Sequence, residues 1–562
     1  MKLTIKRTGL ASALLLCLSP FAAAEPWQNI TQPIGTLLVN PPESALSVNQ
    51  YLMSLDKNIT PATYPFDLRT DVTKIRTTQT LYFVRVYDEA TGSKPVGSWI
   101  MRASEARGLN TAQIRNIQAL PDVPTKFTFI KVPAGITLYT GIAGPIVGWG
   151  DGGANQSKVI GPPYVPEINH INQQLIGDCL LCYRVLAPSG NAHRVGAAFD
   201  RGTPAPYSSL DTLYNNLDMI YFAPNPGRLQ DALNSLSGEG ATASQSIAFG
   251  NNAFFMEAIR QNTANWVTSA SPVGEKSTAK GGSELWANLT GGTSLLRGDN
   301  GTAGVNASGA GVQIGLNRPL TPNVLVGAAL GLANSSYSVN DRASNGTLNG
   351  LNLGLYGVAK ADNLYLSGTL GYAWSDTGSD RSVSVSELSN AQKGNFASQI
   401  LSVRLETGYV ARLENNNLTP FIALEPAWLR QGAFSENLRS SNTPVNMGLN
   451  YRSQQISSLP LSLGMQWDSN VTLDNGWTLN PVMRLSWIHE FNSARQVDAS
   501  LQLMPSQTFT VHGASAPENM GRLVLGLSGT SRAGLTGYVM LDANVSDRSQ
   551  AFGAKAGLSM LF

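Results

Sequence analysis

The segment Phe552-Gly-Ala-Lys-Ala-Gly-Leu-Ser-Met-Leu-Phe562 decides the fold of the C-terminal half of this chain. Every second position is apolar, from Phe552 through Leu558 to Phe562, and the positions between are small or charged up to Ser559. Alternation with a period of two is the pattern of a β-strand that has one apolar and one wet face. The segment therefore predicts a strand of a membrane-spanning β-barrel.

The N-terminus has the pattern of a secretory signal peptide. A basic segment, Met1–Arg7, precedes the apolar stretch Leu10–Leu18 and the small residues Ala22-Ala-Ala24. The apolar stretch is too short to span a bilayer, so we expect cleavage after residue 24, with a retained anchor as the alternative. No run of eighteen apolar residues occurs elsewhere, and we expect no transmembrane helix.

The composition fits an exported chain with a barrel. The chain of 562 residues is too long for one hydrophobic core, which predicts two or three domains. Only 14% of the residues are charged and 55 are glycine, as expected where outward faces meet lipid and strands must coil. The net charge of +2 is uninformative, and no basic block suggests nucleic acid as a partner.

From about residue 283 onward, alternating segments follow one another, separated by Asn, Asp, Gly and Ser. In the segment 401–413, Leu401 and Leu405 share one face, and Arg404 and Glu406 share the other. Charges that fall on the same side as small residues indicate a polar lumen. Other clear cases are Leu351–Ala359, Leu364–Trp374 and Met483–Glu490.

The sequence contains thirteen candidate strands, whereas single-chain bacterial barrels have an even number. The alternation is poorest around Ser500–Gly513, so we exclude that segment and predict twelve strands. A soluble β-sandwich is the alternative. It would explain the alternation but not the apolar strand that ends in Phe562.

Several motifs occur in the order found in autotransporters of type V secretion, and the C-terminal part resembles their translocator barrel. The resemblance implies a barrel over residues 280–562 and a junction and lumen helix over 228–279. It places a lumen helix at Ser244–Asn265, where Glu257 and Arg260 would meet the lumen charges, with an ordinary surface helix as the alternative. The motifs are Leu285-Trp-Ala-Asn-Leu-Thr290, Gly354-Leu-Tyr-Gly357, Pro420-Phe-Ile-Ala-Leu-Glu425, Leu485-Ser-Trp-Ile-His-Glu-Phe491 and, upstream, Leu229-Gln-Asp-Ala-Leu-Asn-Ser-Leu-Ser-Gly-Glu239.

This resemblance also implies the location and the partners of the protein. The barrel would lie in the outer membrane of a Gram-negative bacterium, in contact with lipid. Its C-terminal strand would bind the barrel-assembly machinery, and the N-terminal passenger would reach the cell surface. The expected fold class is mainly β, a twelve-stranded transmembrane barrel with a lumen helix preceded by a small α+β passenger domain.

We expect the passenger to be a compact domain over residues 25–162, because it shows no repeat that would build a solenoid. A looser linker, residues 163–227, contains Cys179 and Cys182. In an oxidising compartment these cysteines favour a structural disulfide, with incidental thiols as the alternative. A zinc site with His170 and His193 lacks the usual ligand spacing, and a redox centre lacks its usual fold context.

Within the passenger we predict strands at Thr80–Tyr87, Val96–Met101, Lys126–Val132 and Ile136–Tyr139. A polar helix is predicted over Ser104–Leu120, with Ser104 or Asn110 as its cap and Pro121 at its end. A glycine loop, Ala143–Gln156, follows. Its glycines would let the backbone approach a ligand and present N–H groups, with a surface turn as the alternative.

Four short motifs in order resemble the TNT-type NAD glycohydrolase toxins. They are Gly97-Ser-Trp99, Gln118-Ala-Leu-Pro121, Ile142-Ala-Gly-Pro-Ile146 and Gly152-Gly-Ala-Asn-Gln156. The resemblance implies that Gln156 and Arg85 are catalytic and that Gly152, Gly153 and Ser98 bind the NAD substrate, with neither a metal nor another cofactor.

The sequence departs from that family at two positions. Gln118 stands where the family has an arginine, and the strand at 126–132 offers Lys126, Thr128 or Lys131 instead of a histidine. Cleavage of the nicotinamide–ribose bond needs stabilisation of a cationic ribose and delivery of water, which a glutamine and an arginine can support. The alternatives are a non-catalytic adhesin that binds a host-cell surface, and ADP-ribosyl transfer with Glu89 or Glu105.

Overall fold

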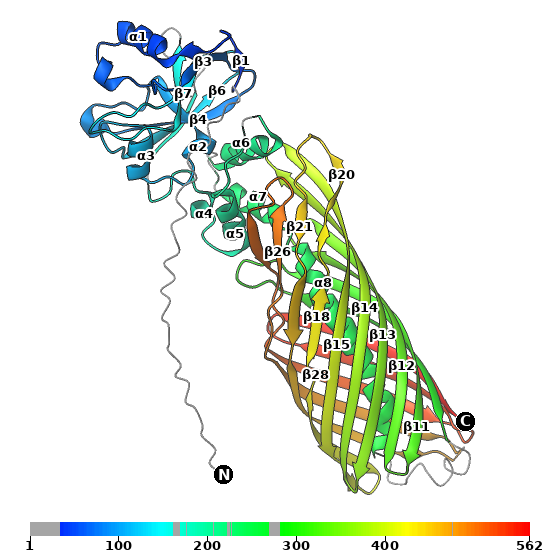
Figure 1. The fold of residues 1–562 in the computed structure, drawn as a ribbon. Helices are drawn as coiled ribbons and strands as arrows, with labels where there is room; N and C mark the ends of the chain where they lie inside the picture. The colour runs from blue at the N-terminus through cyan, green and yellow to red at the C-terminus, as the bar shows by residue number, and fades with distance from the viewer. Residues whose placement is uncertain are drawn as a thin grey trace, which may run out of the picture. The chain divides into compact units, whose positions relative to one another are not determined.

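The computed structural model describes residues 34–160, 169–175, 177–205, 207–221, 225, 227–268, 282–474 and 476–562 (Figure 1). The predicted signal peptide lies outside the described residues. The chain divides into two compact units, the first ending at Leu181 and the second comprising Cys182–Phe562. In the part of the chain that the structure describes, no helix is both long and apolar enough to cross a membrane.

The second unit contains a closed antiparallel barrel of twelve strands, as predicted. Three of the twelve are interrupted, and their pieces carry separate labels. In order around the barrel, the strands are β10 (Glu284–Leu296), β11 (Val305–Thr321), β12 (Val324–Val339), β13 (Ser344–Ala361), β14 (Leu364–Val385), β15 (Leu388–Tyr409) with β16 (Ala411–Leu413), β17 (Asn416–Leu424) with β18 (Ala427–Gln431) and β20 (Asn437–Ser441), β22 (Gln454–Ser458) with β23 (Pro460–Ser469) and β24 (Val471–Thr472), β25 (Thr478–Glu490), β28 (Asn519–Thr530), β29 (Leu535–Val545) and β30 (Ser549–Leu561).

The barrel closes between its first and last strands. Leu561 of β30 is paired with Glu284 of β10, and the backbone of Phe562 exchanges two hydrogen bonds with Ser283. The side chain of Leu558 is 59% exposed, whereas Lys555 is buried. The alternation in the C-terminal segment therefore corresponds to an outward apolar face and an inward polar face.

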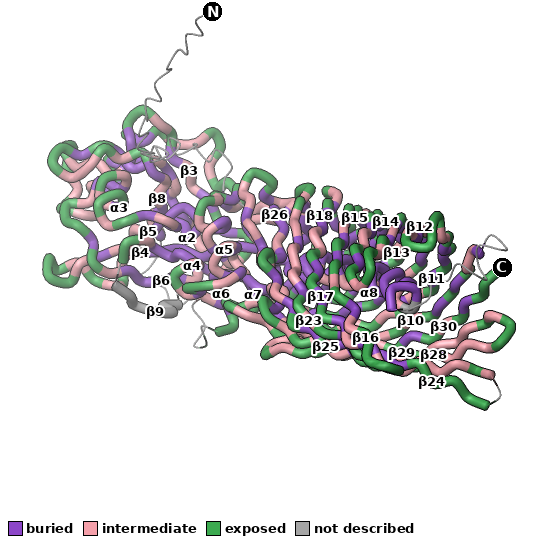
Figure 2. The backbone as a smooth tube through the Cα atoms, turned by 90° about the horizontal axis from the view of Figure 1, so that it is seen from below, coloured by how far each residue is buried: buried purple, intermediate pink, exposed green. Residues whose placement is uncertain are grey.

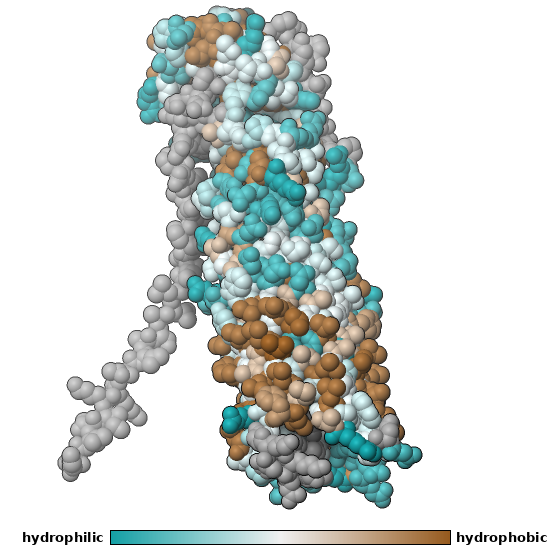
Figure 3. Space-filling view, turned by 90° about the vertical axis from the view of Figure 1, so that its right-hand side faces the viewer, coloured by the Kyte–Doolittle hydropathy of each residue, from teal (hydrophilic) through white to brown (hydrophobic). Residues whose placement is uncertain are grey.

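The same alternation runs around the barrel, as the changing colour along each strand shows in Figure 2. Leu401 and Leu405 are exposed, and Arg404 and Glu406 are buried, on the faces that the sequence predicts. Figure 3 shows apolar residues gathered in a band across the lower part of the visible barrel face, with more polar residues above and below it. Such a band is the surface that a bilayer covers.

The segment Ser500–Gly513 does not belong to the barrel, which confirms its exclusion from the strand count. It contributes to β26 (Gln496–Leu501) and β27 (Thr508–His512), which pair with each other. Together with β19 (Phe434–Ser435) and β21 (Leu449–Tyr451) they form a separate four-stranded sheet in the order β19-β21-β26-β27.

Helix α8 (Gly240–Thr268) lies inside the barrel (Figures 1 and 2). It contains the whole helix predicted at Ser244–Asn265. Phe255 and Ile259 pack against Trp286 and Tyr356 of the barrel wall. Apolar contacts with the wall therefore fix one side of the helix.

Four further helices belong to the second unit. They are α4 (Tyr183–Leu186), α5 (Gly190–Phe199), α6 (Ser209–Tyr221) and α7 (Gly227–Ser237). The sequence analysis assigns most of this region to a loose linker, but Phe199 and Leu217 share a hydrophobic core with Leu229 and Val511. The reason is visible in α6, whose apolar residues recur every three or four positions and give it a buried face.

The first unit is built on a nine-stranded sheet with the order β1-β3-β7-β8-β5-β4-β6-β9, in which β2 also pairs with β3. Its strands are β1 (Thr36–Leu37), β2 (Glu43–Ser44), β3 (Asp71–Arg76), β4 (Leu81–Tyr87), β5 (Trp99–Arg102), β6 (Lys126–Val132), β7 (Thr137–Ile142), β8 (Asn155–Ile160) and β9 (Asn169–Leu175). Its helices are α1 (Ala45–Leu55), η1 (Pro61–Thr63), η2 (Glu89–Thr91), α2 (Ala103–Ala106) and α3 (Thr111–Ile117).

Helix α1 packs Val48 and Leu52 against Phe66 and Tyr139. The helix expected over Ser104–Leu120 is broken into α2 and α3, because Gly108 has a φ of 86° between them. Asn110 caps α3 by accepting from the backbone N–H of Gln113 at 2.9 Å. The neighbourhood of β8 is thus framed by α1, α3 and the adjacent strands.

Candidate functional site

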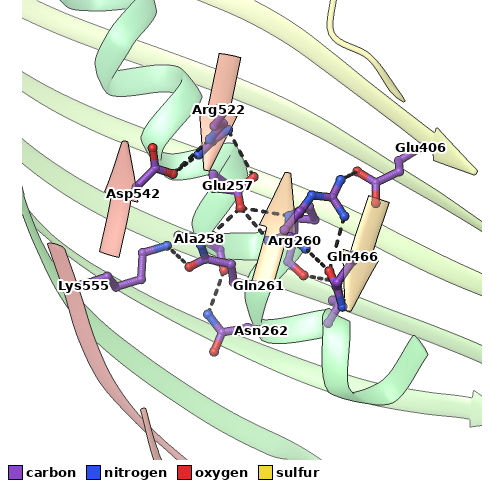
Figure 4. Close-up of polar contacts among 12 residues, drawn as sticks. Glu257, Ala258, Arg260, Gln261, Asn262, Glu406, Gln466, Arg522, Asp542 and Lys555 are labelled. Carbon is purple, nitrogen blue, oxygen red and sulfur yellow. Dashed lines mark hydrogen bonds and ion pairs between the residues drawn. The ribbon is translucent and has the colours of Figure 1, made fainter. Parts of the chain in front are cut away.

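A charged cluster joins α8 to the barrel wall (Figure 4). Glu257, Arg260 and Gln261 of α8 are three and four residues apart and share one face of the helix. One oxygen of Glu257 accepts from Arg260 Nη2 at 2.6 Å and from Gln261 Nε2 at 3.1 Å. Its other oxygen lies 3.5 Å from Arg522 Nη1 and 3.8 Å from Arg404 Nη1.

The cluster continues along the wall as alternating charges. Arg404 pairs with both Glu406 and Glu425 at 2.7 Å, and Arg484 pairs with Glu406 at 2.8 Å. Arg522 pairs with Asp542, and Lys555 donates to Gln261 at 2.6 Å. Buried charges are costly unless each has a partner, so this network fixes the position of the helix in the lumen.

The prediction that Glu257 and Arg260 meet lumen charges is confirmed. Arg404 and Glu406 lie on the inward face that the alternation predicts. Arg522, Asp542 and Lys555 are not among the predicted lumen charges, although Lys555 stands between outward apolar residues in the segment that predicts the fold. Inward position on a strand is therefore the signal that would have found them.

In the first unit, Gln156 is the second residue of β8. It is paired with Gly141 of β7, and its Nε2 donates to the backbone oxygen of Pro65 at 2.6 Å. Gln156 and Lys158 are alternate residues of one strand and point to the same face of the sheet. Phe66, which follows Pro65, packs on Trp99 with ring centroids 5.6 Å apart.

The glycine loop before Gln156 folds back onto α3. Gly152 has a φ of 67°, and its N–H donates to the oxygen of Asn116 at 3.0 Å. Gly153 has a φ of 97°, and its N–H donates to Ala143 at 2.9 Å. Both N–H groups are therefore bonded to backbone oxygens, that of Gly152 to α3 and that of Gly153 within the loop, whereas the sequence predicts that they face a ligand.

Arg85 of β4 wraps around the segment that precedes β5. Its Nε donates to the oxygen of Lys94 at 2.9 Å and its Nη1 to the oxygen of Trp99 at 3.2 Å. A Cβ at Gly97 would lie 1.9 Å from the guanidinium carbon of Arg85, so a larger residue here would displace the Arg85 side chain. Arg85 therefore contacts the segment 94–99, which contains Ser98. Gln156 contacts a different segment, at Pro65.

The four motifs of the NAD glycohydrolase resemblance converge on β8. Gln118 donates to the oxygen of Asn155 at 3.1 Å, and Ile142 is paired with the same residue. The backbone N–H of Val159 donates to the oxygen of Ser98 at 2.8 Å. Segments from four places in the sequence therefore surround the strand that carries Gln156.

The Nζ of Lys158 is hydrogen-bonded to the hydroxyl of Ser98 and lies 5.0 Å from the centroid of the Trp99 ring. Burial lowers the pKa of Lys158, the nearby Asp56 opposes this effect, and Arg85 adds to it. Lys158 is not among the site residues that the sequence predicts. Its position two residues after Gln156, on the same face of the same strand, is the feature that could have identified it.

Cys179 and Cys182 are disulfide-bonded, in agreement with the predicted disulfide. Glu89 pairs with Lys126 at 2.5 Å, and Glu105 is buried. His170 lies in β9. Among the described residues, no group of three or more His, Cys, Asp or Glu side chains could hold a metal ion.

Comparisons with known proteins concern the second unit. Residues 285–542 match the family model described as the autotransporter beta-domain. Three solved structures are similar: the translocator domain of the autotransporter NalP from Neisseria meningitidis (16% identity, 57% of this chain and 98% of that chain, TM-score 0.42), the beta domain of the Bordetella autotransporter BrkA (18%, 50% and 100%, 0.37) and the transport unit of the autotransporter AIDA-I from Escherichia coli (14%, 54% and 97%, 0.35). No curated protein matches this chain.

The family match covers the closed barrel, and the geometry of the barrel agrees with it. The outward face is apolar, the inward face is charged, and a helix lies in the lumen. The chain therefore carries an autotransporter translocator domain, a twelve-stranded barrel in the outer membrane of a Gram-negative bacterium, which displays its own passenger at the cell surface.

Proposed function

We propose that the displayed passenger cleaves NAD in the manner of a glycohydrolase. The observation that supports this proposal most directly is the convergence of the four resembling motifs on β8. Gly97-Ser-Trp99, Gln118 and Ile142 all contact this strand or the residue next to Gln156. Motifs that are far apart in the sequence but adjacent in space are what one site requires.

In the proposed reaction, Gln156 and Arg85 have separate roles. The amide of Gln156 can donate and accept at once, which suits the orientation of a ribose hydroxyl or of the attacking water. A guanidinium binds a pyrophosphate through paired hydrogen bonds. Because Arg85 donates to the oxygens of Lys94 and Trp99, the guanidinium would have to release part of these contacts on binding.

A second candidate function is non-catalytic binding to a host-cell surface. The observation that favours it is that the N–H groups of Gly152 and Gly153 already donate to backbone oxygens of Asn116 and Ala143. These donors hold the loop in shape and are not free to bind a ligand. This arrangement suits recognition of a surface as well as catalysis.

The two candidates are distinguished with the purified full-length protein in detergent. The protein is mixed with NAD, and nicotinamide release is followed for the wild type, Gln156→Ala and the control Gln50→Ala. Gln50 is an exposed residue of α1. We expect release by the wild type and the control, and a loss of about 100-fold in Gln156→Ala, the usual scale for a positioned catalytic group.

Release that is absent in the folded wild type, or equal in Gln156→Ala, would contradict NAD cleavage and leave surface binding as the function. Gln156→Ala also removes the hydrogen bond to Pro65, which contributes about 1 kcal/mol to stability. Gln156→Glu serves as a second variant, since it keeps the shape of the side chain. Hydrogen exchange of β7 and β8 peptides reports whether each variant is folded.

We also propose that the barrel-assembly machinery recognises β30 during insertion. The exposed apolar residues Leu558, Met560 and Phe562 on one face of the strand support this. Deletion of Phe562 should lower the fraction of protein recovered in the outer membrane, and Phe562→Tyr should restore most of it. Unchanged recovery after the deletion would contradict a role for the terminal residue.

A further inference from the structure

Ser98 and Lys158 form a hydrogen-bonded pair; the NAD glycohydrolase resemblance gives Ser98 a substrate-binding role and gives Lys158 none. The hydroxyl of Ser98 contacts the Nζ of Lys158 directly. The two residues come from adjacent strands, since Trp99 is paired with Lys158 and the N–H of Val159 donates to Ser98 at 2.8 Å. The backbone therefore fixes the distance between them, and both side chains are only half-buried.

The surroundings of Lys158 lower the pKa of its amine relative to that of an exposed lysine. Burial lowers the pKa of this amine most, and the positive charge of Arg85 lowers it further. The negative charge of Asp56, which caps the C-terminus of α1, raises the pKa of Lys158 and opposes these two effects. The ring of Trp99 covers the amine on one side, and Tyr139 is its cross-strand neighbour on β7. A neutral amine beside a hydroxyl can accept the proton of that hydroxyl.

We propose that Ser98 is a nucleophile activated by Lys158, and that the passenger hydrolyses carboxylic esters through an acyl-enzyme. A hydroxyl is a weak nucleophile unless an adjacent base takes its proton, and serine–lysine pairs use this solution. The partial exposure of both side chains gives a substrate access to them. Arg85, whose guanidinium lies against Gly97, supplies positive charge beside the reacting group.

The reaction balances without a cofactor. Ser98 Oγ attacks the ester carbonyl carbon as its proton passes to Lys158 Nζ. The carbon–oxygen bond to the leaving alcohol then breaks, and Lys158 returns the proton to that alcohol. Water attacks the acyl-serine with Lys158 again as the base, which releases the carboxylic acid and restores the Ser98 hydroxyl.

The pair is tested with the purified full-length protein in detergent and a fluorophosphonate probe, which forms a covalent bond with activated serines. Labelled wild-type protein is digested, and the modified residue is identified by mass spectrometry. We expect one label per chain, on Ser98. The hydrolysis of p-nitrophenyl butyrate is measured beside it, since this reaction is independent of NAD.

Two variants and two controls complete the test. We expect Ser98→Ala to abolish labelling and Lys158→Met to slow it about 100-fold, as for loss of a general base. The controls are Ser54→Ala, in the exposed part of α1, and Lys74→Met, whose amine lies 5.3 Å from the Tyr139 ring; both should label at the wild-type rate. The labelling rate should rise with pH as Lys158 loses its proton, with a midpoint below the ordinary lysine pKa.

No label on the folded wild type, or label on another serine, would overturn the proposal. Because the modified residue is mapped on the wild type, the result does not depend on the folding of the variants. Nicotinamide release and ester hydrolysis are separate readouts. Loss of one and retention of the other therefore shows which of the two proposals fails.

Discussion

The carboxylate of Glu257 in α8 lies 3.5 Å from the guanidinium of Arg522 in β28. The two residues are far apart in the sequence, and both are largely buried in the barrel lumen. Arg260 and Arg404 face the same carboxylate. One acidic residue therefore compensates several buried cations and connects the helix to two sides of the wall.

We predict that Glu257→Gln weakens the association of α8 with the barrel. Loss of one partner from a buried ion pair costs about 3–5 kcal/mol, and here Arg260 is left buried without its carboxylate partner, while Arg404 and Arg522 keep Glu406, Glu425 and Asp542. The temperature at which the barrel loses its fast electrophoretic migration should fall. Glu387→Gln, in an exposed turn, is the control and should migrate as the wild type. Equal transition temperatures for all three proteins would contradict the structural role of the cluster.

The outward face of the barrel gives a second prediction. Leu405 is 50% exposed among other exposed apolar residues of the neighbouring strands, including Leu366 and Leu424. Leu405→Arg should destabilise the barrel by about 2–4 kcal/mol if this position lies near the bilayer midplane. Leu438→Arg is the matched control, because its neighbours in β20 are exposed and polar. If Leu405→Arg and Leu438→Arg reduced the fraction of folded barrel in liposomes equally, the location of the apolar band would be contradicted.

Much of the barrel could be predicted because lipid outside and charge inside impose a period of two on every strand. Arg404 and Glu406 show this clearly, since both are buried on either side of the outward Leu405. The exclusion of Ser500–Gly513 rested on the same rule. The prediction of the helix at 244–265 depends on the autotransporter resemblance together with loosely helical spacing. Periodicity alone does not reveal it, because polar residues such as Gln245 and Glu257 are buried beside the apolar ones and leave no single apolar stripe.

The site residues were harder to predict, because contacts between remote segments leave no local pattern. The partner of Gln156 is the backbone oxygen of Pro65, which no side-chain motif reveals. Lys158 has no local pattern that sets it apart from other strand residues, because its partner Ser98 lies on another strand. The sequence predicts a linker before residue 227, whereas the structure has helices there, with Leu213 and Leu217 buried on one face of α6.

We predict that the first unit loses part of its folding stability at acid pH and that this loss depends on Asp67. The hydrogen bond from Arg69, 2.7 Å away, lowers the pKa of the Asp67 carboxyl. A carboxyl whose pKa is lower in the folded state stabilises the fold while ionised, and this contribution is lost as the pH falls through the folded pKa. Because Arg69 is exposed, the loss is under about 1 kcal/mol.

This effect is measured as hydrogen exchange of the peptide that contains Asp71–Arg76, between pH 7 and pH 3. The rates are corrected for the intrinsic pH dependence of exchange. Wild-type protection should fall over this range more than that of Asp67→Asn, whose side chain does not titrate. Asp122→Asn, at an exposed turn, should behave as the wild type. A wild type and an Asp67→Asn variant that lose protection equally would contradict this assignment.

The junction between passenger and barrel should remain uncut. Ser237 and Glu239 are buried, and Glu239 pairs at 2.6 Å with Arg342 in the turn between β12 and β13. A protease cannot reach a backbone that is held in this way. Mass spectrometry of the culture supernatant should therefore find little passenger. An abundant fragment ending between residues 200 and 270 would contradict the expectation.

The most direct test of the display function places an epitope tag at the exposed turn after Gly92 and expresses the full chain in a Gram-negative host. Intact cells are labelled with an antibody, and outer-membrane fractions are analysed by electrophoresis with and without heating. The structure predicts labelling without permeabilisation, together with a barrel that migrates faster when unheated. Labelling only after permeabilisation, or a C-terminal fragment in the soluble periplasm without heat-dependent migration, would contradict the assignment of residues 280–562 as the barrel that displays the passenger.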